Sequence, residues 1–161
     1  MRERQFQSSL DLAVSPERAF AWLADYRNLA RILDGIRTWE PLGQETAGAG
    51  ARFEVVMSVF GFRLENVVVL DAWDPPREIA WASESGVPTQ SGGWTFTPVE
   101  GGVRVNLEIA YQAPRLAPRA LVARVDGEVR ARLERALGRL RMILEGEDQN
   151  RASEVADRRE A

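Results

Sequence analysis

The feature that most restricts the fold of this chain is a series of strand-like segments between residues 36 and 113. The expected strands span residues 36–45, 51–60, 62–73, 77–85, 92–99 and 103–113. The breaks between them contain Gly48, Gly61, Pro75 with Pro76, Pro88 and Gly101, which are residue types that favour turns. Because such short connections join strands that run in opposite directions, the pattern predicts an antiparallel meander.

The alternation of side chains predicts which residues share the inner face of this sheet. A tight turn at Gly61 pairs odd positions before it with even positions after it. It therefore places Phe53, Val55, Met57 and Val59 beside Leu64, Asn66, Val68 and Leu70. The same argument at Gly101 places Trp94, Phe96 and Pro98 beside Val105, Leu107, Ile109 and Tyr111. The inner face is thus expected to be apolar, with Asn66 and Tyr111 as polar exceptions.

The segments on either side of the meander complete the expected element order. Residues 5–14 alternate like a strand, and two short amphipathic helices follow, with N-caps at Ser15 and Asp25. Residues 118–146 have apolar residues at three-four spacing and predict one long helix. Residues 147–161 are too polar for the core and are expected to be a frayed tail. We therefore expect a single domain over residues 1–146 and a polar C-terminal tail over 147–161.

Composition excludes several classes of chemistry. The 161 residues include no cysteine and no histidine, so thiol chemistry, histidine triads and ordinary zinc sites are excluded. No metal-binding loop motif is present, and we expect neither a metal nor a cofactor. No apolar run is long enough for a transmembrane helix, and residues 1–10 lack the apolar core of a secretory signal. These observations predict a cytoplasmic protein.

Four motifs carry a resemblance to a known family: VSPERAF at residues 14–20, DPPR at 74–77, GWTFTP at 93–98 and GGVRV at 101–105. With the element order, they resemble the START-like (SRPBCC) superfamily, in its polyketide cyclase/dehydrase-type or coenzyme Q-binding-type branch. The resemblance covers about residues 5–145. It implies an α+β helix-grip fold, in which a curved antiparallel sheet of about seven strands wraps around a long C-terminal helix, with two short helices after the first strand. It also implies a hydrophobic ligand, such as a lipid, quinone or polyketide, between sheet and helix.

The residues expected to line that cavity are inward positions of the strands and of the long helix. They are Phe53, Val55, Met57, Asn66, Val68, Trp81, Ser83, Trp94, Phe96, Leu107, Ile109, Tyr111, Val125, Val129 and Leu133. Asn66 is expected either to bind a ligand or to bond a neighbouring strand or water. Tyr111 is expected either to orient or protonate a ligand or to pack at the rim of the core. These two are the only candidates for a catalytic role.

Three functional interpretations remain at this point. The leading one is a non-catalytic carrier or sensor that binds a hydrophobic small molecule. The first alternative is an enzyme similar to a polyketide cyclase, aromatase or dehydratase that acts through pocket shape and a few polar residues. The second is a protein-interaction module that uses the outer sheet face at Val56, Val67 and Val69, or the arginine-rich long helix. A net charge of −3 argues against a nucleic-acid partner, and peripheral contact with a membrane stays open.

Overall fold

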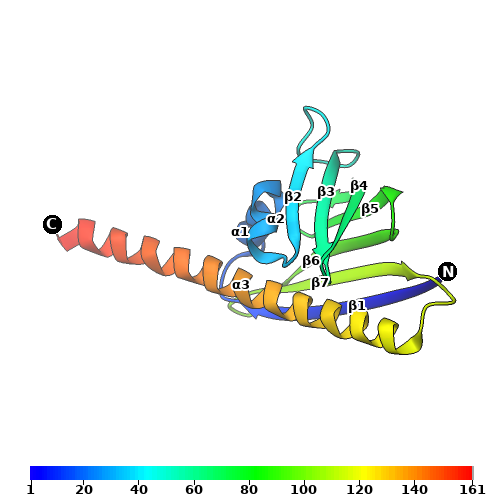
Figure 1. Cartoon of the computed structure of the whole chain (residues 1–161). Coiled ribbons are helices and arrows are strands. Elements are labelled where there is room, and N and C mark those ends of the chain that lie inside the picture. Colours follow the sequence, from blue (N-terminus) through cyan, green and yellow to red (C-terminus); the bar gives the residue numbers. More distant parts are fainter. Residues whose placement is uncertain (161) are drawn as a thin grey trace.

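One curved antiparallel sheet of seven strands faces a long C-terminal helix in this computed structural model, which describes residues 1–160 (Figure 1). The strands are β1 Arg2–Leu12, β2 Ile36–Pro41, β3 Arg52–Val59, β4 Phe62–Asp74, β5 Glu78–Gly86, β6 Gln90–Val99 and β7 Gly102–Ala113. Their order in the sheet is β1-β7-β6-β5-β4-β3-β2, with every neighbouring pair antiparallel. The predicted meander and the helix-grip fold are therefore confirmed.

The register of the sheet agrees with the predicted pairing. Val59 pairs with Phe62 across a two-residue turn in which Phe60 and Gly61 both have positive φ, +49° and +82°, as a type I′ hairpin requires. Further along this hairpin, Phe53 faces Val68. The strand expected over residues 36–45 is shorter, because β2 ends at Pro41 and a loop follows. That loop contains three glycines, which favour irregular backbone over a strand.

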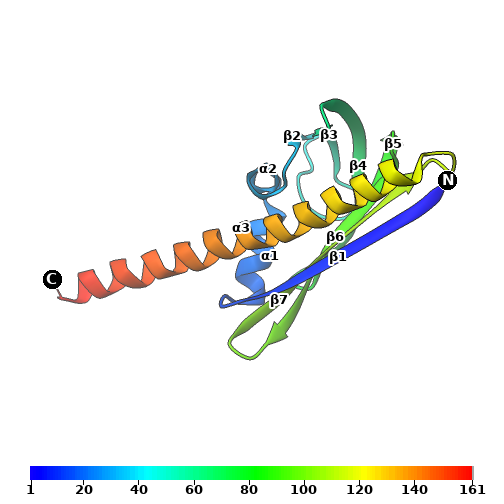
Figure 2. The ribbon, with the colours of Figure 1, turned by 60° about the horizontal axis from the view of Figure 1, so that its bottom comes forward.

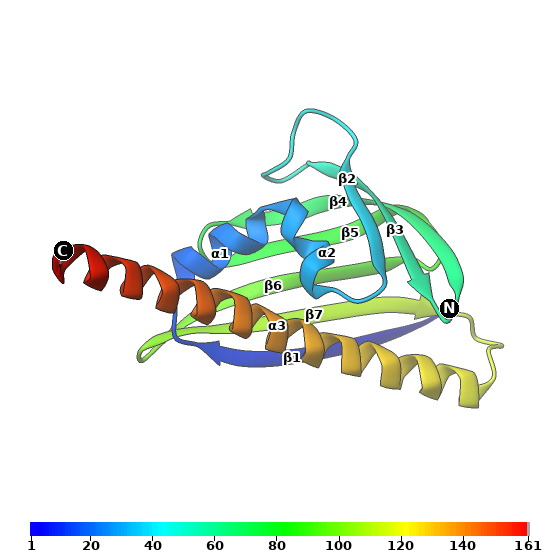
Figure 3. The same ribbon diagram turned by 60° about the vertical axis from the view of Figure 1, so that its left-hand side comes forward.

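Two short helical segments follow β1 and cover one end of the concave face, α1 Pro16–Ala24 and α2 Leu29–Ile32, joined by the 3₁₀ turn Tyr26–Asn28 (Figure 3). The predicted cap at Ser15 is confirmed, whereas Asp25 caps the 3₁₀ turn and not α2, which begins after Asn28 without a side-chain cap. The Ser15 hydroxyl accepts a hydrogen bond from the Arg18 N–H at 3.1 Å, and the Asp25 carboxylate accepts one from the Arg27 N–H at 3.1 Å. Helices this short are marginal alone, and packing against the sheet stabilises them through buried side chains such as Phe20 and Ile32.

The long helix α3 spans Arg119–Glu160 and crosses the sheet diagonally (Figure 2). The expectation of a helix that stops at residue 146 is wrong, because the helix continues to Glu160; residue 161 of the expected tail lies outside the described residues. Residues 147–160 contain no proline or glycine and are rich in good helix formers. Forty-two residues give a helix of roughly 60 Å, whereas the longest strand, of 13 residues, spans roughly 43 Å. The end of α3 therefore projects beyond the sheet in all three views.

The buried apolar residues of α3 are Leu133, Ala136, Leu137, Leu140 and Leu144. These side chains pack in the middle of the helix and leave its first part, before Leu133, less closely packed against the sheet. No helix among residues 1–160 combines the length and the apolar character needed to cross a membrane.

Candidate functional site: a cavity between sheet and helix

A cavity of about 320 Å³ lies between the first part of α3 and the concave face of the sheet. Thirteen of the nineteen residues around it are apolar: Leu33, Ile36, Trp39, Met57, Val59, Leu64, Trp81, Pro88, Ile109, Pro114, Val125, Val129 and Leu133. The other six are Asp34, Gln90, Tyr111, Gln112, Glu128 and Arg132. A water molecule takes about 30 Å³ of the liquid, so the cavity suits a mostly apolar molecule of roughly ten to fifteen non-hydrogen atoms.

Strand register and helix periodicity bring these apolar side chains together. Met57 and Leu64 are direct cross-strand partners on the inner face of the β3–β4 hairpin. On α3, Val125, Val129 and Leu133 follow one another at four-residue spacing and therefore share the face toward the sheet. The wall of the cavity thus comes from distant segments that only the folded sheet and helix place side by side.

Trp81 reaches the cavity because its partner on the next strand has no side chain. Gly92 lies opposite Trp81 in the β5–β6 register, and a Cβ at Gly92 would overlap the indole ring. The indole ring therefore lies close to the backbone of β6 at Gly92. This is a close approach that requires glycine.

Arg132 joins three segments at one side of the cavity. Its Nε donates to Glu128 Oε1 at 2.9 Å, Nη1 donates to the Asp34 carbonyl at 3.2 Å, and Nη2 donates to the Ser58 carbonyl at 3.4 Å. Gly35 has a φ of +79°, and a Cβ there would overlap the guanidinium. The hydrogen bond from Arg132 lowers the pKa of Glu128 and so further favours its ionised form. Arg132 therefore pairs with Glu128 and also bonds two backbone carbonyls.

A second polar cluster lies beside the cavity and consists of Arg4, Tyr111 and Asp126. The Tyr111 hydroxyl donates to Asp126 Oδ1 at 2.8 Å, and Arg4 donates from Nε to the same oxygen at 3.3 Å and from Nη2 to Oδ2. Asp126 is buried, and burial alone would raise the pKa of its carboxyl. The hydrogen bonds from Arg4 and Tyr111 outweigh this effect and keep the pKa of Asp126 below its ordinary value. Burial, followed by the hydrogen bond to Asp126, raises the pKa of Tyr111 to about 12.

Both polar groups of the Asn66 side chain form hydrogen bonds to neighbouring residues. Its Nδ2 donates to the Pro88 carbonyl at 3.1 Å and to the Ser85 carbonyl at 3.4 Å, and its Oδ1 accepts from Gln90 Nε2 at 3.0 Å. Ser83 accepts a hydrogen bond from the Gln90 N–H at 3.0 Å. Of the two roles expected for Asn66, the contacts correspond to bonding a neighbouring strand, and the side chain connects β4 to the β5–β6 turn.

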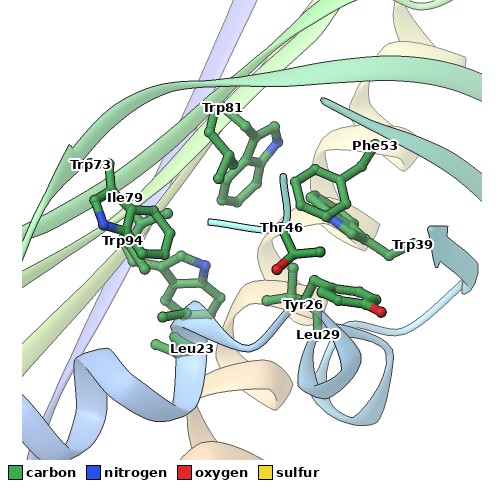
Figure 4. Close-up of a pocket in the computed structure, with 12 residues that line it drawn as sticks. Leu23, Tyr26, Leu29, Trp39, Thr46, Phe53, Trp73, Ile79, Trp81 and Trp94 are labelled. Carbon is green, nitrogen blue, oxygen red and sulfur yellow. The ribbon is translucent and has the colours of Figure 1, made fainter. Parts of the chain in front are cut away.

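A smaller cavity of about 20 Å³ lies beneath α1 and the 3₁₀ turn, and Figure 4 shows the tryptophans around it. Trp39 and Trp81 line both cavities. Their rings meet edge to face, with centroids 5.7 Å apart and planes at 90°, and so form the wall between the two spaces. The buried Nε1–H of Trp94 has no hydrogen-bond acceptor among residues 1–160, and the small cavity has room for about one water molecule.

The structure divides the residues that the sequence assigned to a ligand site into three groups. Around the large cavity lie Met57, Trp81, Ile109, Tyr111, Val125, Val129 and Leu133. Around the small cavity lie Phe53, Trp94 and again Trp81. Six line neither cavity: Val55, Asn66, Val68, Ser83, Phe96 and Leu107. These six residues belong to the packed or hydrogen-bonded interior. Parity predicts the face on which a side chain lies, but it does not predict how far along the strand the cavity extends.

Several residues of the site were not identified from the sequence. Val59 and Leu64 could have been identified, because both lie on the predicted inner face. Asp126 could also have been identified, because it continues the three-four series of α3 between Val122 and Val129, and an acidic residue on a buried helix face needs a partner. Trp39 lies on β2, which belongs to neither of the two hairpins whose pairing was predicted, so the face of its side chain was not predicted.

Comparisons with known proteins agree with this architecture. The family model described as polyketide cyclase / dehydrase and lipid transport matches residues 3–145. The chain belongs to this family. No curated protein matches the sequence.

Solved structures share the fold at low sequence identity. The protein TTHA0849 from Thermus thermophilus aligns with a TM-score of 0.74 and 20% identity, over 89% of this chain and 98% of that one. A START superfamily protein from Mycobacterium smegmatis aligns with a TM-score of 0.70 and 14% identity, over 86% and 98%. The di-domain ARO/CYC StfQ from the steffimycin biosynthetic pathway aligns with a TM-score of 0.72 and 15% identity, over 91% of this chain and 52% of that one.

Proposed function

We propose that this protein binds a hydrophobic small molecule in the cavity of about 320 Å³ and acts as a non-catalytic carrier or sensor. The observation that carries the proposal is the character of the lining, which is apolar apart from six residues. Burying a ligand there removes apolar surface from water on both sides, at about 25 cal/mol per Å². The family description, which includes lipid transport, supports the same class of ligand.

The polar groups beside the cavity favour binding over acid–base catalysis. An efficient general acid has a pKa near the working pH, whereas the pKa of Tyr111 is raised to about 12. The Tyr111 proton is also engaged with Asp126. Arg132 and Glu128 bond each other. These polar side chains therefore already have hydrogen-bond partners within the protein, and their network shapes the cavity.

The proposal is tested first by native mass spectrometry of freshly purified protein, with extraction of any molecule that accompanies it. We expect a hydrophobic adduct at one copy per chain. The delipidated protein should then bind a fatty acid, a quinone or a naphthol probe with micromolar affinity in isothermal titration calorimetry. Val129→Trp should abolish this binding because it fills the cavity, whereas Met142→Trp, on the exposed face of α3, should leave it unchanged. Absence of both an adduct and micromolar affinity would refute the proposal.

A second candidate function is a cyclase- or dehydratase-like enzyme, and the contact of Tyr111 with Asp126 beside the cavity is the observation that favours it. A solved structure with the same fold is named as an aromatase/cyclase di-domain protein. In this case the cavity would turn over a polyketide-like substrate, and Tyr111→Phe would slow turnover more than binding. Unchanged turnover in Tyr111→Phe would eliminate this role for the tyrosine.

The third interpretation is an interaction module that uses the outer sheet face or the arginine-rich long helix, and the sheet face is less exposed than the sequence predicted. Val56, which the sequence placed on that face, is buried in the folded chain. Val67 and Val69 are only partly exposed. The outer face therefore offers no continuous apolar patch at these three positions.

A further inference from the structure

Several large apolar side chains are exposed close in sequence to residues that line the large cavity. Phe62 is 72% exposed, Val87 76% and Leu116 97%, and Phe60 and Leu121 are also exposed. An exposed apolar cluster of this kind marks an interaction surface more often than isolated exposed residues do. We refer to these five residues as the apolar rim.

Each residue of the apolar rim is close in sequence to a residue that lines the cavity. Phe60 follows Val59 and Phe62 precedes Leu64 by two positions, on the β3–β4 hairpin. Val87 precedes the lining residue Pro88, Leu116 lies two positions after Pro114, and Leu121 is one helical turn before Val125. The rim therefore comes from three separate connections, each next to residues that line the same cavity.

Contacts between these connections hold the rim together at one end of the sheet. The guanidinium of Arg124 on α3 lies over the Phe60 ring, 4.8 Å from its centroid, and connects the hairpin to the first turns of the helix. The Gln112 N–H donates to the Thr89 carbonyl at 3.0 Å and connects the end of β7 to the β5–β6 turn. Figure 3 shows the hairpin, this turn and the start of α3 at the end of the sheet where the N-terminus lies.

The segment that carries Leu116 and Leu121 has a charge opposite in sign to that of the whole chain. Residues 114–125 contain three arginines, Arg115, Arg119 and Arg124, and no acidic residue, in a chain with a net charge of −3. None of the three forms an ion pair with an acidic side chain among residues 1–160. The rim therefore combines protruding apolar side chains with cationic groups, which is the combination that binds anionic lipid surfaces.

We propose that the apolar rim and its arginines dock this protein onto an anionic lipid bilayer, with the opening of the cavity toward the membrane. Phe62, Val87 and Leu116 enter the interfacial region while Arg115 and Arg119 contact lipid phosphates. Docking in this orientation gives an apolar ligand a path between lipid and cavity that avoids bulk water. Only this last consequence rests on the function proposed above, because the docking itself requires no ligand.

The test is co-sedimentation of the full chain with vesicles of phosphatidylcholine mixed with phosphatidylglycerol, and with vesicles of phosphatidylcholine alone. We expect binding to the mixed vesicles that weakens with added salt, and much weaker binding to phosphatidylcholine. Phe62→Ser and Leu116→Ser should each reduce the affinity about tenfold. Arg115→Glu and Arg119→Glu should each reduce it at least about fivefold. Met142→Ser, a matched change at an exposed apolar residue outside the rim, should have no effect.

Three outcomes would overturn the proposal. The first is equal binding of the wild type to both kinds of vesicle, or no binding to either. The second is an equal loss in Met142→Ser and Leu116→Ser, which would mean that the rim has no special role. The third is self-association through the rim. A self-associating wild type that Leu116→Ser makes monomeric, without vesicle binding, would assign the rim to a second copy of the chain instead. Titration of the same variants with a soluble naphthol probe separates this result from failure of the cavity, since rim substitutions should leave probe affinity unchanged.

Discussion

Replacing Trp81 with alanine tests the division of the interior into two cavities. Trp81 is 3% exposed, lies against Gly92 and forms the dividing wall with Trp39. We expect Trp81→Ala to lower the free energy of unfolding by about 4 kcal/mol, within the range of about 3–5 kcal/mol for buried tryptophan. A domain stable by about 5–15 kcal/mol would remain folded. Urea denaturation followed by circular dichroism measures this loss.

The same substitution should change the size of ligand that the protein accepts. In the wild type, the affinity for straight-chain alcohols should rise about fourfold per methylene group, as expected for about 0.8 kcal/mol each. The rise should end at roughly ten to twelve carbons, where the cavity of about 320 Å³ is full. In Trp81→Ala it should continue for several more carbons, because about nine non-hydrogen atoms of indole are removed and the cavities join. Isothermal titration calorimetry over a series of alcohols gives both limits.

Phe96→Ala is the matched control for this experiment. Phe96 is also 3% exposed but lines neither cavity, so its removal should cost a similar free energy of unfolding without changing the chain-length limit. A wild-type limit in Trp81→Ala would show that Trp81 does not separate the two cavities. An equal shift of the limit in Phe96→Ala would show the same.

Three further predictions concern the sheet, the buried carboxylate and the end of α3. Gly92→Ala should destabilise the protein by about 2 kcal/mol or more, because the new methyl group overlaps Trp81; thermal unfolding would show it. Asp126 has a lowered pKa in the folded chain, so its stabilisation is present above the ordinary aspartate pKa and lost as the pH falls through the folded value. Asp126→Asn should therefore be less stable than wild type at pH ~7, and its stability should fall less in acid, as denaturant titrations across pH would show. Deletion of residues 147–161 should leave ligand affinity unchanged, since residues 147–160 line neither cavity; altered affinity on calorimetry would contradict the predicted boundary at residue 146.

Local sequence patterns were sufficient to predict the elements and the direction of many side chains. Turn residues at Gly61 and Gly101 set the pairing of two hairpins. Because side chains alternate between the two faces of a strand, fixing the register also fixes the face on which each side chain lies. Ser15 and Asp25 indicated the starts of the helical segments, since only a few side chains satisfy a free N–H at a helix start. These features are local, and local chemistry decides them.

The tertiary structure alone decided where the interior is empty. Val55 and Met57 lie on the same face of one strand, yet Val55 is fully buried in the core and Met57 lines the cavity. The difference depends on how close α3 comes to each point of the curved sheet, which is a distance between segments far apart in sequence. Likewise, Arg4, Tyr111 and Asp126 form one cluster only because β1, β7 and α3 meet there. Parity and periodicity carry no information on such distances, so packing between elements determines the size, the wall and the polar contacts of the cavity.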